Sequence, residues 1–219
     1  MNREILKKNF EAGGFIVTFF DTKEAAADYI VESISGSAGG SGSTGGSGSA
    51  GGSGSIGGSG TTVGFGGSMT AKEMGLYDRL KAAGNDCVWH WADADKGPAV
   101  FEKAFHAENY ILSANGVSEE GYIVNIDGTG NRIAATVYGK KKVWFVVGKN
   151  KIVPTLEEAM KRADTTAAIL NAKRFLPADA AEEQIEAKRD QSCRAMTIHR
   201  KPMNGMVCEI VFVDEELGY

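Results

Sequence analysis

The stretch Asn125-Ile-Asp-Gly-Thr-Gly-Asn-Arg132 follows an apolar run at Tyr122 to Val124 and leads into a helical pattern. A second stretch, Gly64-Phe-Gly-Gly-Ser-Met-Thr70, follows Thr61 to Val63 in the same way. Each therefore places glycines and hydroxyls at a strand-to-helix turn. Glycine lets the backbone approach a ligand, and the first amides of the following helix carry the positive end of its dipole. Two such turns in one chain predict one shared cleft for an anion.

Strands and helices alternate on both sides of these two loops. β-branched and aromatic runs predict strands at residues 15–20, 61–63, 86–91, 109–112, 122–124 and 142–147. Caps followed by apolar periodicity predict helices between them. This alternation favours an α/β fold with a mostly parallel sheet, helices on both faces, and ligands at the carboxyl ends of the strands. Residues 195–200 and 206–213, joined by Pro202-Met-Asn-Gly205, predict a C-terminal β-hairpin.

Residues 39–62 divide the chain into a strand-helix part at 1–38 and a remainder at 63–219. They are four copies of a six-residue Gly/Ser-rich unit. Such a composition buries too little apolar surface to offset the entropy of ordering, so we expect a flexible tether. The regularity of the repeat indicates an engineered or generated insertion, with a natural low-complexity loop as the alternative.

Composition excludes several classes of protein. The 219 residues are 42% hydrophobic and 24% charged, which is enough to bury a core. A net charge of −4 offers no basic surface for nucleic acid. No apolar stretch is long enough for a membrane or a signal segment, so a cytoplasmic location is expected. Three cysteines without paired spacing predict neither disulfides nor a metal site.

Neither glycine loop matches the stricter nucleotide fingerprints. A Walker loop needs Lys-Ser/Thr after its last glycine, and the dinucleotide signature needs Gly-x-Gly-x-x-Gly. No cofactor is therefore predicted. His90, His106 and His199 have no ligand-type neighbours in sequence and are interpreted as packed or surface imidazoles. The alternative to an anion site is that both loops are turns and helix caps without a ligand.

The predicted ligand-binding residues combine backbone amides, hydroxyls, amides of asparagine side chains and two lysines as counter-charges. They are Gly66, Gly67, Ser68, Thr70, Asn115, Gly128, Thr129, Gly130, Asn131, Lys149 and Lys151. Phosphorylated sugars, carboxylates and CoA phosphates all suit such a site. Lys149 and Lys151 as solvated surface lysines remain an alternative.

Several motifs in order along the chain resemble the LUD domain, the lactate-utilisation family typified by LutC and YkgG. They are the two glycine loops, Leu112-Ser-Ala-Asn-Gly-Val-Ser-Glu-Glu-Gly121, Val146-Val-Gly-Lys-Asn-Lys-Ile152, Asn171-Ala-Lys-Arg174 and Glu216-Leu-Gly-Tyr219. The resemblance implies a fold like that of the NagB/RpiA/CoA-transferase superfamily. For some members it also implies a role beside iron–sulfur proteins in oxidising lactate to pyruvate.

Two departures separate this chain from the family pattern. Members of this subtype usually carry a cysteine cluster between the Asn-Ala-Lys-Arg motif and the last strands, and only Cys193 stands there. A metal at that place is not expected without thiolate ligands. The Gly/Ser repeat replaces what is a short turn in relatives, so the resemblance predicts the fold more strongly than the activity.

The resemblance also suggests two carboxylates as catalytic candidates. Isomerases of the superfamily use a carboxylate base, and its CoA transferases use a glutamate followed closely by glycine. Glu120 directly precedes Gly121 and is the candidate for such a group. Asp127 is the second candidate, although its position favours capping the helix that starts near Asn131.

Three functional hypotheses follow, and the sequence leaves open whether the protein is an enzyme. The first is an enzyme or binding protein for a small anionic, phosphorylated or acyl molecule linked to lactate or carboxylate utilisation. The second is a non-catalytic partner of lactate-oxidising redox proteins. The third is a scaffold that retains only the fold. The oligomeric state is not predicted.

Overall fold

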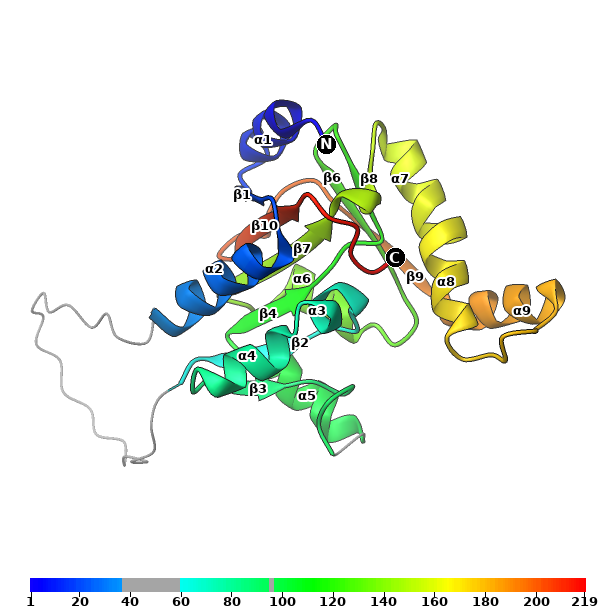
Figure 1. The fold of residues 1–219 in the computed structure, drawn as a ribbon, viewed down its shortest axis with the longest axis horizontal. Helices are drawn as coiled ribbons and strands as arrows, with labels where there is room; N and C mark the ends of the chain where they lie inside the picture. Colours follow the sequence, from blue (N-terminus) through cyan, green and yellow to red (C-terminus); the bar gives the residue numbers. More distant parts are fainter. Residues whose placement is uncertain (37–59, 95–96) are drawn as a thin grey trace, which may run out of the picture.

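The computed structural model describes residues 1–36, 60–94 and 97–219, and Figure 1 shows them as a ribbon coloured along the chain. Residues 39–59 of the predicted tether lie outside the described residues. Residues 60–62 are described, and Thr62 is the first residue of a strand. Ten strands within these ranges form a six-stranded and a four-stranded sheet.

All neighbouring strands of the six-stranded sheet are parallel, as the alternating pattern predicts. The order is β1 (Ile16–Phe20), β10 (Val207–Val213), β7 (Lys142–Gly148), β4 (Asn109–Leu112), β2 (Thr62–Phe65) and β3 (Asp86–Val88). β1 precedes the Gly/Ser repeat in the chain and pairs with β10 near the other end of the sequence. The segment before the repeat is therefore part of the same sheet as the remainder.

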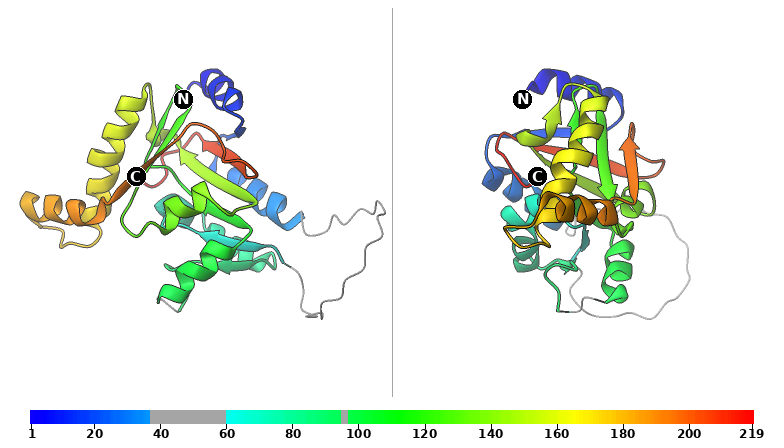
Figure 2. Two further views of the ribbon diagram at one scale, coloured as in Figure 1. Left: turned by 180° about the vertical axis from the view of Figure 1, so that it is seen from behind. Right: turned by 90° about the vertical axis from the view of Figure 1, so that its right-hand side faces the viewer.

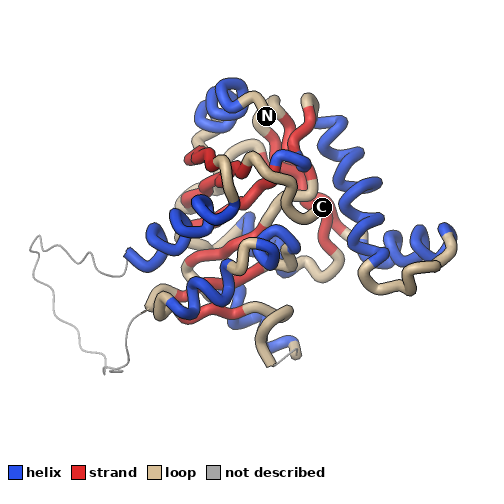
Figure 3. The backbone as a smooth tube through the Cα atoms, viewed as in Figure 1, coloured by secondary structure: helices blue, strands red, loops and turns tan. Residues whose placement is uncertain are grey.

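Helices cover both faces of this sheet, which confirms the expected architecture (Figure 3). In β7, Trp144 and Val146 point to one face, while Val143, Phe145 and Val147 point to the other. The first face packs against α2 (Lys23–Gly36), α3 (Met69–Glu73) and α4 (Leu76–Ala82). The second packs against α1 (Arg3–Ala12), α5 (Pro98–His106) and α6 (Asn131–Val137). A strand apolar on both faces is what a buried parallel sheet requires.

The smaller sheet has the order β8 (Ile152–Val153), β5 (Gly116–Ser118), β6 (Tyr122–Asp127) and β9 (Ala195–His199). β9 pairs antiparallel with β6, whereas β10 pairs with β1 and β7 in the larger sheet. The predicted C-terminal hairpin is therefore wrong. Met206 N donates to Met203 O in the predicted turn, but the strands on either side of it enter different sheets, where their partners lie far away in sequence.

A helical arm lies beside the smaller sheet. α7 (Leu156–Arg162), a π-helical turn (Ala163–Ala167) and α8 (Ala168–Lys173) follow one another, and α9 (Glu182–Ser192) extends from the far end, as Figures 1 and 2 show. Thr155 and Glu158 form the capping box that the sequence predicts at the start of α7. Ala159 and Ala163 pack on Val124 and Ile126 of β6, which holds the arm against the molecule.

Both strands before the glycine loops are longer than expected. β2 runs through Gly64 to Phe65, and β6 runs through to Asp127. A Cβ on Gly64 would lie 2.3 Å from the carbonyl oxygen of Ala104 in α5. Glycine is therefore needed at position 64 for close helix-to-sheet packing, and the loop proper begins at Gly66.

Candidate functional site

The loops at the carboxyl ends of β2, β3, β4, β6 and β7 surround a cavity of about 340 Å³. Ser68 from the first glycine loop and Thr129 from the second both line it. Residues of both loops therefore line one cavity, and the binding of a ligand there stays a prediction. The volume is at the lower end of the range for small-molecule sites.

The first glycine loop contributes its backbone and one buried cap. Gly67 and Ser68 line the cavity, while Gly66 and Thr70 lie behind it. Ser68 Oγ accepts from the amide of Ala71 and so begins α3, two residues before the Thr70 cap that the sequence suggests. Ser68 is 4% exposed, so its hydroxyl serves the helix as well as the cavity wall.

The second glycine loop wraps around Asp127. Asp127 Oδ1 accepts from the amides of Thr129 and Gly130 at 3.1 and 3.2 Å, and Oδ2 accepts from those of Arg132 and Ile133 at 3.0 and 3.2 Å. The alternative role for Asp127, capping the helix, is confirmed. These four amides already have a carboxylate as acceptor. An external anion must therefore be held mainly by other groups of the cavity.

Arg132 joins the two glycine loops and is not among the site residues predicted from the sequence. Its guanidinium donates to Gly67 O at 3.3 Å, to Asn115 Oδ1 at 3.2 Å and to Ile126 O, and its Nε lies 3.8 Å from Asp127 Oδ2. A Cβ on Gly66 would lie 3.0 Å from Arg132 Cγ, so glycine at 66 makes room for this side chain. Arg132 lines the cavity.

Lys151 lies on the cavity wall and is 2% exposed. Its Nζ donates to Ser113 Oγ at 2.9 Å and to Thr70 Oγ1 at 3.0 Å. Burial, followed by the nearby charges of Arg162 and Arg132, lowers its pKa to about 7. The alternative that Lys151 is a solvated surface lysine is wrong, because the 3₁₀ turn Lys149–Lys151 directs this side chain inward.

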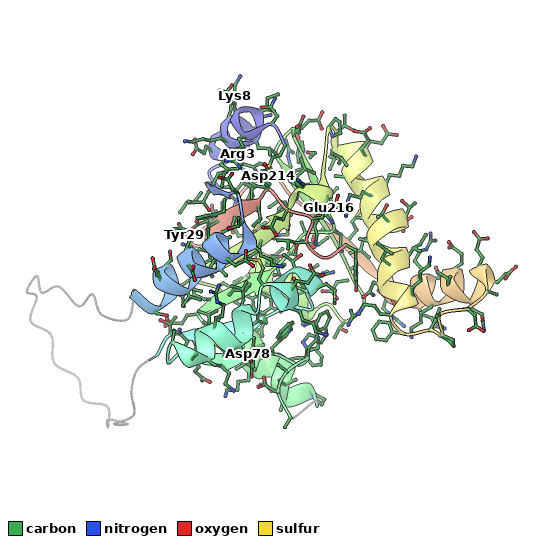
Figure 4. The ribbon with its side chains drawn as sticks, in the orientation of Figure 1. Arg3, Lys8, Tyr29, Asp78, Asp214 and Glu216 are labelled. Atoms are coloured by element: carbon green, nitrogen blue, oxygen red, sulfur yellow. The ribbon has the colours of Figure 1, made fainter. Side chains whose placement is uncertain are left out.

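Lys149 is not among the residues that line the cavity. Its side chain is 44% exposed, and its Nζ lies 3.4 Å from Asp214, which is labelled in Figure 4. Arg3 lies 3.5 Å from the same carboxylate. For this lysine the surface alternative fits the geometry, and its predicted ligand contact has no support from its position.

Glu120 also lies outside the cavity lining. Its Oε2 accepts from the amide of Leu156 at 2.8 Å, at the start of α7. Glu120 precedes β6, whereas Asp127 is the last residue of that strand, so the two residues lie at opposite ends of β6. The position of Glu120 gives no support to a role as nucleophile or base in this cavity.

The two predicted asparagines both line the cavity. Asn115 Oδ1 accepts from the amide of Ile126 at 2.8 Å and from the Arg132 guanidinium at 3.2 Å. Asn115 therefore holds the Arg132 side chain next to the end of β6. Asn131 is the first residue of α6, after Gly130, whose φ of +89° suits the left-handed turn there. Gly128 and Thr129 line the cavity, and Gly130 does not.

The opposite wall comes from residues that the sequence analysis quoted only within motifs or not at all. Arg174 donates to Asn171 Oδ1 at 3.2 Å and to the Tyr219 hydroxyl at 3.1 Å, and its guanidinium carbon lies 4.3 Å from the ring centre of Trp91. Tyr219 thereby lies against α8, where Figure 1 marks the C-terminus. The available signals were that Arg174 and Tyr219 each end a stretch that resembles the LUD domain.

His90 and Trp91 also line the cavity, and their positions correct the strand that was predicted at 86–91. That strand ends at Val88, and the Trp89 and Trp91 rings then stack at 5.4 Å instead of alternating across a sheet. His90 lines the cavity and lies 4.7 Å from the ring of Phe101. Cys193 lines it too, and burial raises the pKa of its thiol. Within the described ranges no cluster of three or more His, Cys, Asp or Glu side chains suits a metal ion.

The charge of the cavity favours an anion. Among its described lining residues Arg132, Lys151 and Arg174 are basic, and Asp127 is acidic. The Asp127 carboxylate is already surrounded by four amides and Arg132, so its charge is largely compensated within the loop. A carboxylate or phosphate can accept from guanidinium groups in pairs of parallel hydrogen bonds.

The structure thus defines an α/β protein with a basic cavity at the carboxyl ends of a parallel sheet. The family model of the LUD domain matches residues 3–196, which is most of the 219-residue chain. The chain therefore belongs to the LUD domain family. Among the helices of the described ranges, none has both the length and the apolar character needed to cross a bilayer.

A solved structure has the same fold. The crystal structure of a DUF162 family protein from Deinococcus radiodurans matches with a TM-score of 0.51 and 13% sequence identity, over 96% of this chain and 95% of that one. At this identity the likeness shows the fold alone. No curated protein matches the chain.

Proposed function

We propose that this LUD domain protein binds a small anionic metabolite, a carboxylate or a phosphorylated compound, in the cavity between the two glycine loops. The observation that carries the proposal is the net basic character of the described cavity lining, because Arg132 and Asp127 offset each other while Arg174 and the protonated fraction of Lys151 have no acidic counterpart among the lining residues. The resemblance to lactate-utilisation proteins supports placing the ligand in carboxylate metabolism. A role beside lactate-oxidising redox proteins remains a prediction, as does a cytoplasmic location.

The cavity supplies binding groups from both of its walls. Arg132 is held from the side of the second loop by Asp127 and Asn115. Arg174 is held from the side of the arm by Asn171 and by its contact with Trp91. Because both guanidinium groups are fixed by protein partners, little side-chain entropy is lost when an anion binds.

A thermal-shift screen tests the proposal with matched pairs of charged and neutral compounds: lactate against lactamide, pyruvate against acetone, and ribose 5-phosphate against ribose. A ligand at 100 times its dissociation constant adds about 2.7 kcal/mol to the free energy of unfolding. For a chain of this size that raises the melting temperature by roughly 5 to 10 °C.

We expect at least one anion to shift the melting temperature while its neutral partner does not. If every anion leaves the melting temperature unchanged, or if neutral partners shift it equally, the cavity does not select anions and the proposal fails.

A further inference from the structure

Two hydroxyl groups contact the Lys151 amine, and one further direction around its nitrogen points away from both. Ser113 Oγ donates to Val146 O at 2.6 Å, and Thr70 Oγ1 donates to Leu217 O at 3.1 Å. Each hydroxyl has a single hydrogen, so both oxygens act as acceptors toward Lys151 Nζ. A neutral amine that donates both hydrogens to them keeps its lone pair for the third direction. Lys151 and Ser113 both line the cavity, and we infer that this direction faces it.

The charges around Lys151 favour the neutral amine. Among the described residues, no carboxylate forms an ion pair with it, and its hydrogen-bond partners are the two hydroxyls. Arg132 and Arg162 act against a further positive charge, and Glu73 acts in the opposite direction. Together with burial, these groups lower the pKa of Lys151 to about 7, against 10.5 for an ordinary lysine. A large fraction of the amine is then unprotonated near neutral pH.

We propose that Lys151 is a nucleophile that forms an imine with a small anion bearing a ketone or aldehyde group, held in the cavity by Arg132 and Arg174. This inference rests on the proposed function, because the reactant occupies the same cavity. The nitrogen lone pair attacks the carbonyl carbon, and both amine hydrogens leave with the carbonyl oxygen as water. A carbon–nitrogen double bond remains. Protonation of the imine nitrogen then adds one N–H, which donates to one of the two hydroxyl oxygens.

Reductive trapping tests this proposal on the full chain. The protein is incubated with sodium cyanoborohydride and either pyruvate, as a 2-oxo acid, or dihydroxyacetone phosphate, as a phosphorylated ketone. The hydride reduces the imine to a stable secondary amine, which peptide mass spectrometry locates in the sequence. We expect one adduct per chain, on Lys151, and the more reactive compound identifies whether the anionic group is a carboxylate or a phosphate.

Lys149 provides a matched control two residues away. The Lys149→Met variant should keep the adduct, and Lys151→Met and Lys151→Arg should lose it. Mapping the adduct in the unsubstituted protein does not depend on how well these variants fold. Binding is measured alongside by thermal shift without the reductant.

The outcomes separate the two proposals. If either ketone raises the melting temperature but no adduct forms on Lys151, the imine is overturned and anion binding stands. If neither ketone binds or reacts, the imine is overturned as well. Adducts spread over many surface lysines, with none enriched at Lys151, also contradict it.

Discussion

Lys149 and Lys151 show how strongly position decides what a lysine can do. From the sequence, both are predicted as counter-charges of the same kind. One faces solvent and pairs with Asp214, and the other is enclosed with two hydroxyls and no ion-pair partner among the described residues. A buried amine shifts its pKa far more readily than a guanidinium, so the second position gives lysine a chemistry that arginine would not have.

The pH dependence of stability should report the state of Lys151. Its pKa is about 7 in the folded protein and 10.5 as the reference value. Between these values the unfolded chain binds more protons than the native one, so this group's contribution to the free energy of unfolding rises with pH. Below about pH 7 both states are protonated, and the contribution is at its smallest.

Chemical denaturation of the unsubstituted protein and of Lys151→Met, from about pH 6 to about pH 9, isolates this contribution. Burial also lowers the pKa of Lys140, to about 8, but Lys140 is present in both proteins, and its effect cancels in the difference. We expect the stability of the unsubstituted protein to rise relative to the variant as the pH increases. Parallel pH profiles would show that Lys151 keeps an ordinary pKa.

At the residue scale the sequence predicted local roles better than distant ones. The cap formed by Asp127 was predictable because all of its partners lie within six residues. The role of Arg132 was not, because its long side chain reaches Gly67, 65 residues away in sequence. Arg174 likewise acquires its place from Trp91 and Tyr219, which only the folded chain brings to it.

At the element scale, the turn between β6 and α6 is organised by one carboxylate. Asp127→Asn replaces an acceptor oxygen by an N–H donor, so amides that now reach Asp127 lose their acceptor and Arg132 loses its counter-charge. Loss of a helix cap and of charge-assisted hydrogen bonds predicts a destabilisation of about 2 kcal/mol. Chemical denaturation measures it.

Asp78→Asn is the matched control, because Asp78 lies exposed on α4, as labelled in Figure 4. It should change the free energy of unfolding by no more than about 0.5 kcal/mol. Equal losses in the two variants would mean that the Asp127 cap contributes nothing specific.

The two errors at this scale have different causes. A turn signal predicts that the chain reverses, but it does not predict which strands will pair. In this protein β9 and β10 enter different sheets. Glu120 was selected from its neighbour Gly121, although the strand predicted at residues 122–124 already separates it from Asp127. Registers and strand partners depend on long-range packing that periodicity does not contain.

At the scale of the whole molecule, the parallel sheet was predictable because strand and helix patterns alternate through most of the chain. That architecture places loops from distant parts of the sequence at one edge, where the cavity lies. The convergence of the two glycine loops followed from this rule. Lys151 was predicted as a counter-charge, but Arg132 and Arg174 were not, because long-range packing decides which arginines the fold turns inward.

Titration calorimetry with the anion that gives the largest thermal shift tests the central claim most directly. The unsubstituted protein is compared with Arg174→Gln and with Arg79→Gln, whose arginine pairs with Asp28 on the surface. We predict saturable binding of one ligand per chain, with a dissociation constant at least about tenfold higher in Arg174→Gln, which corresponds to about 1.4 kcal/mol, and unchanged in Arg79→Gln. The same dissociation constant in all three proteins, or no binding to any of them, would contradict an anion site in this cavity.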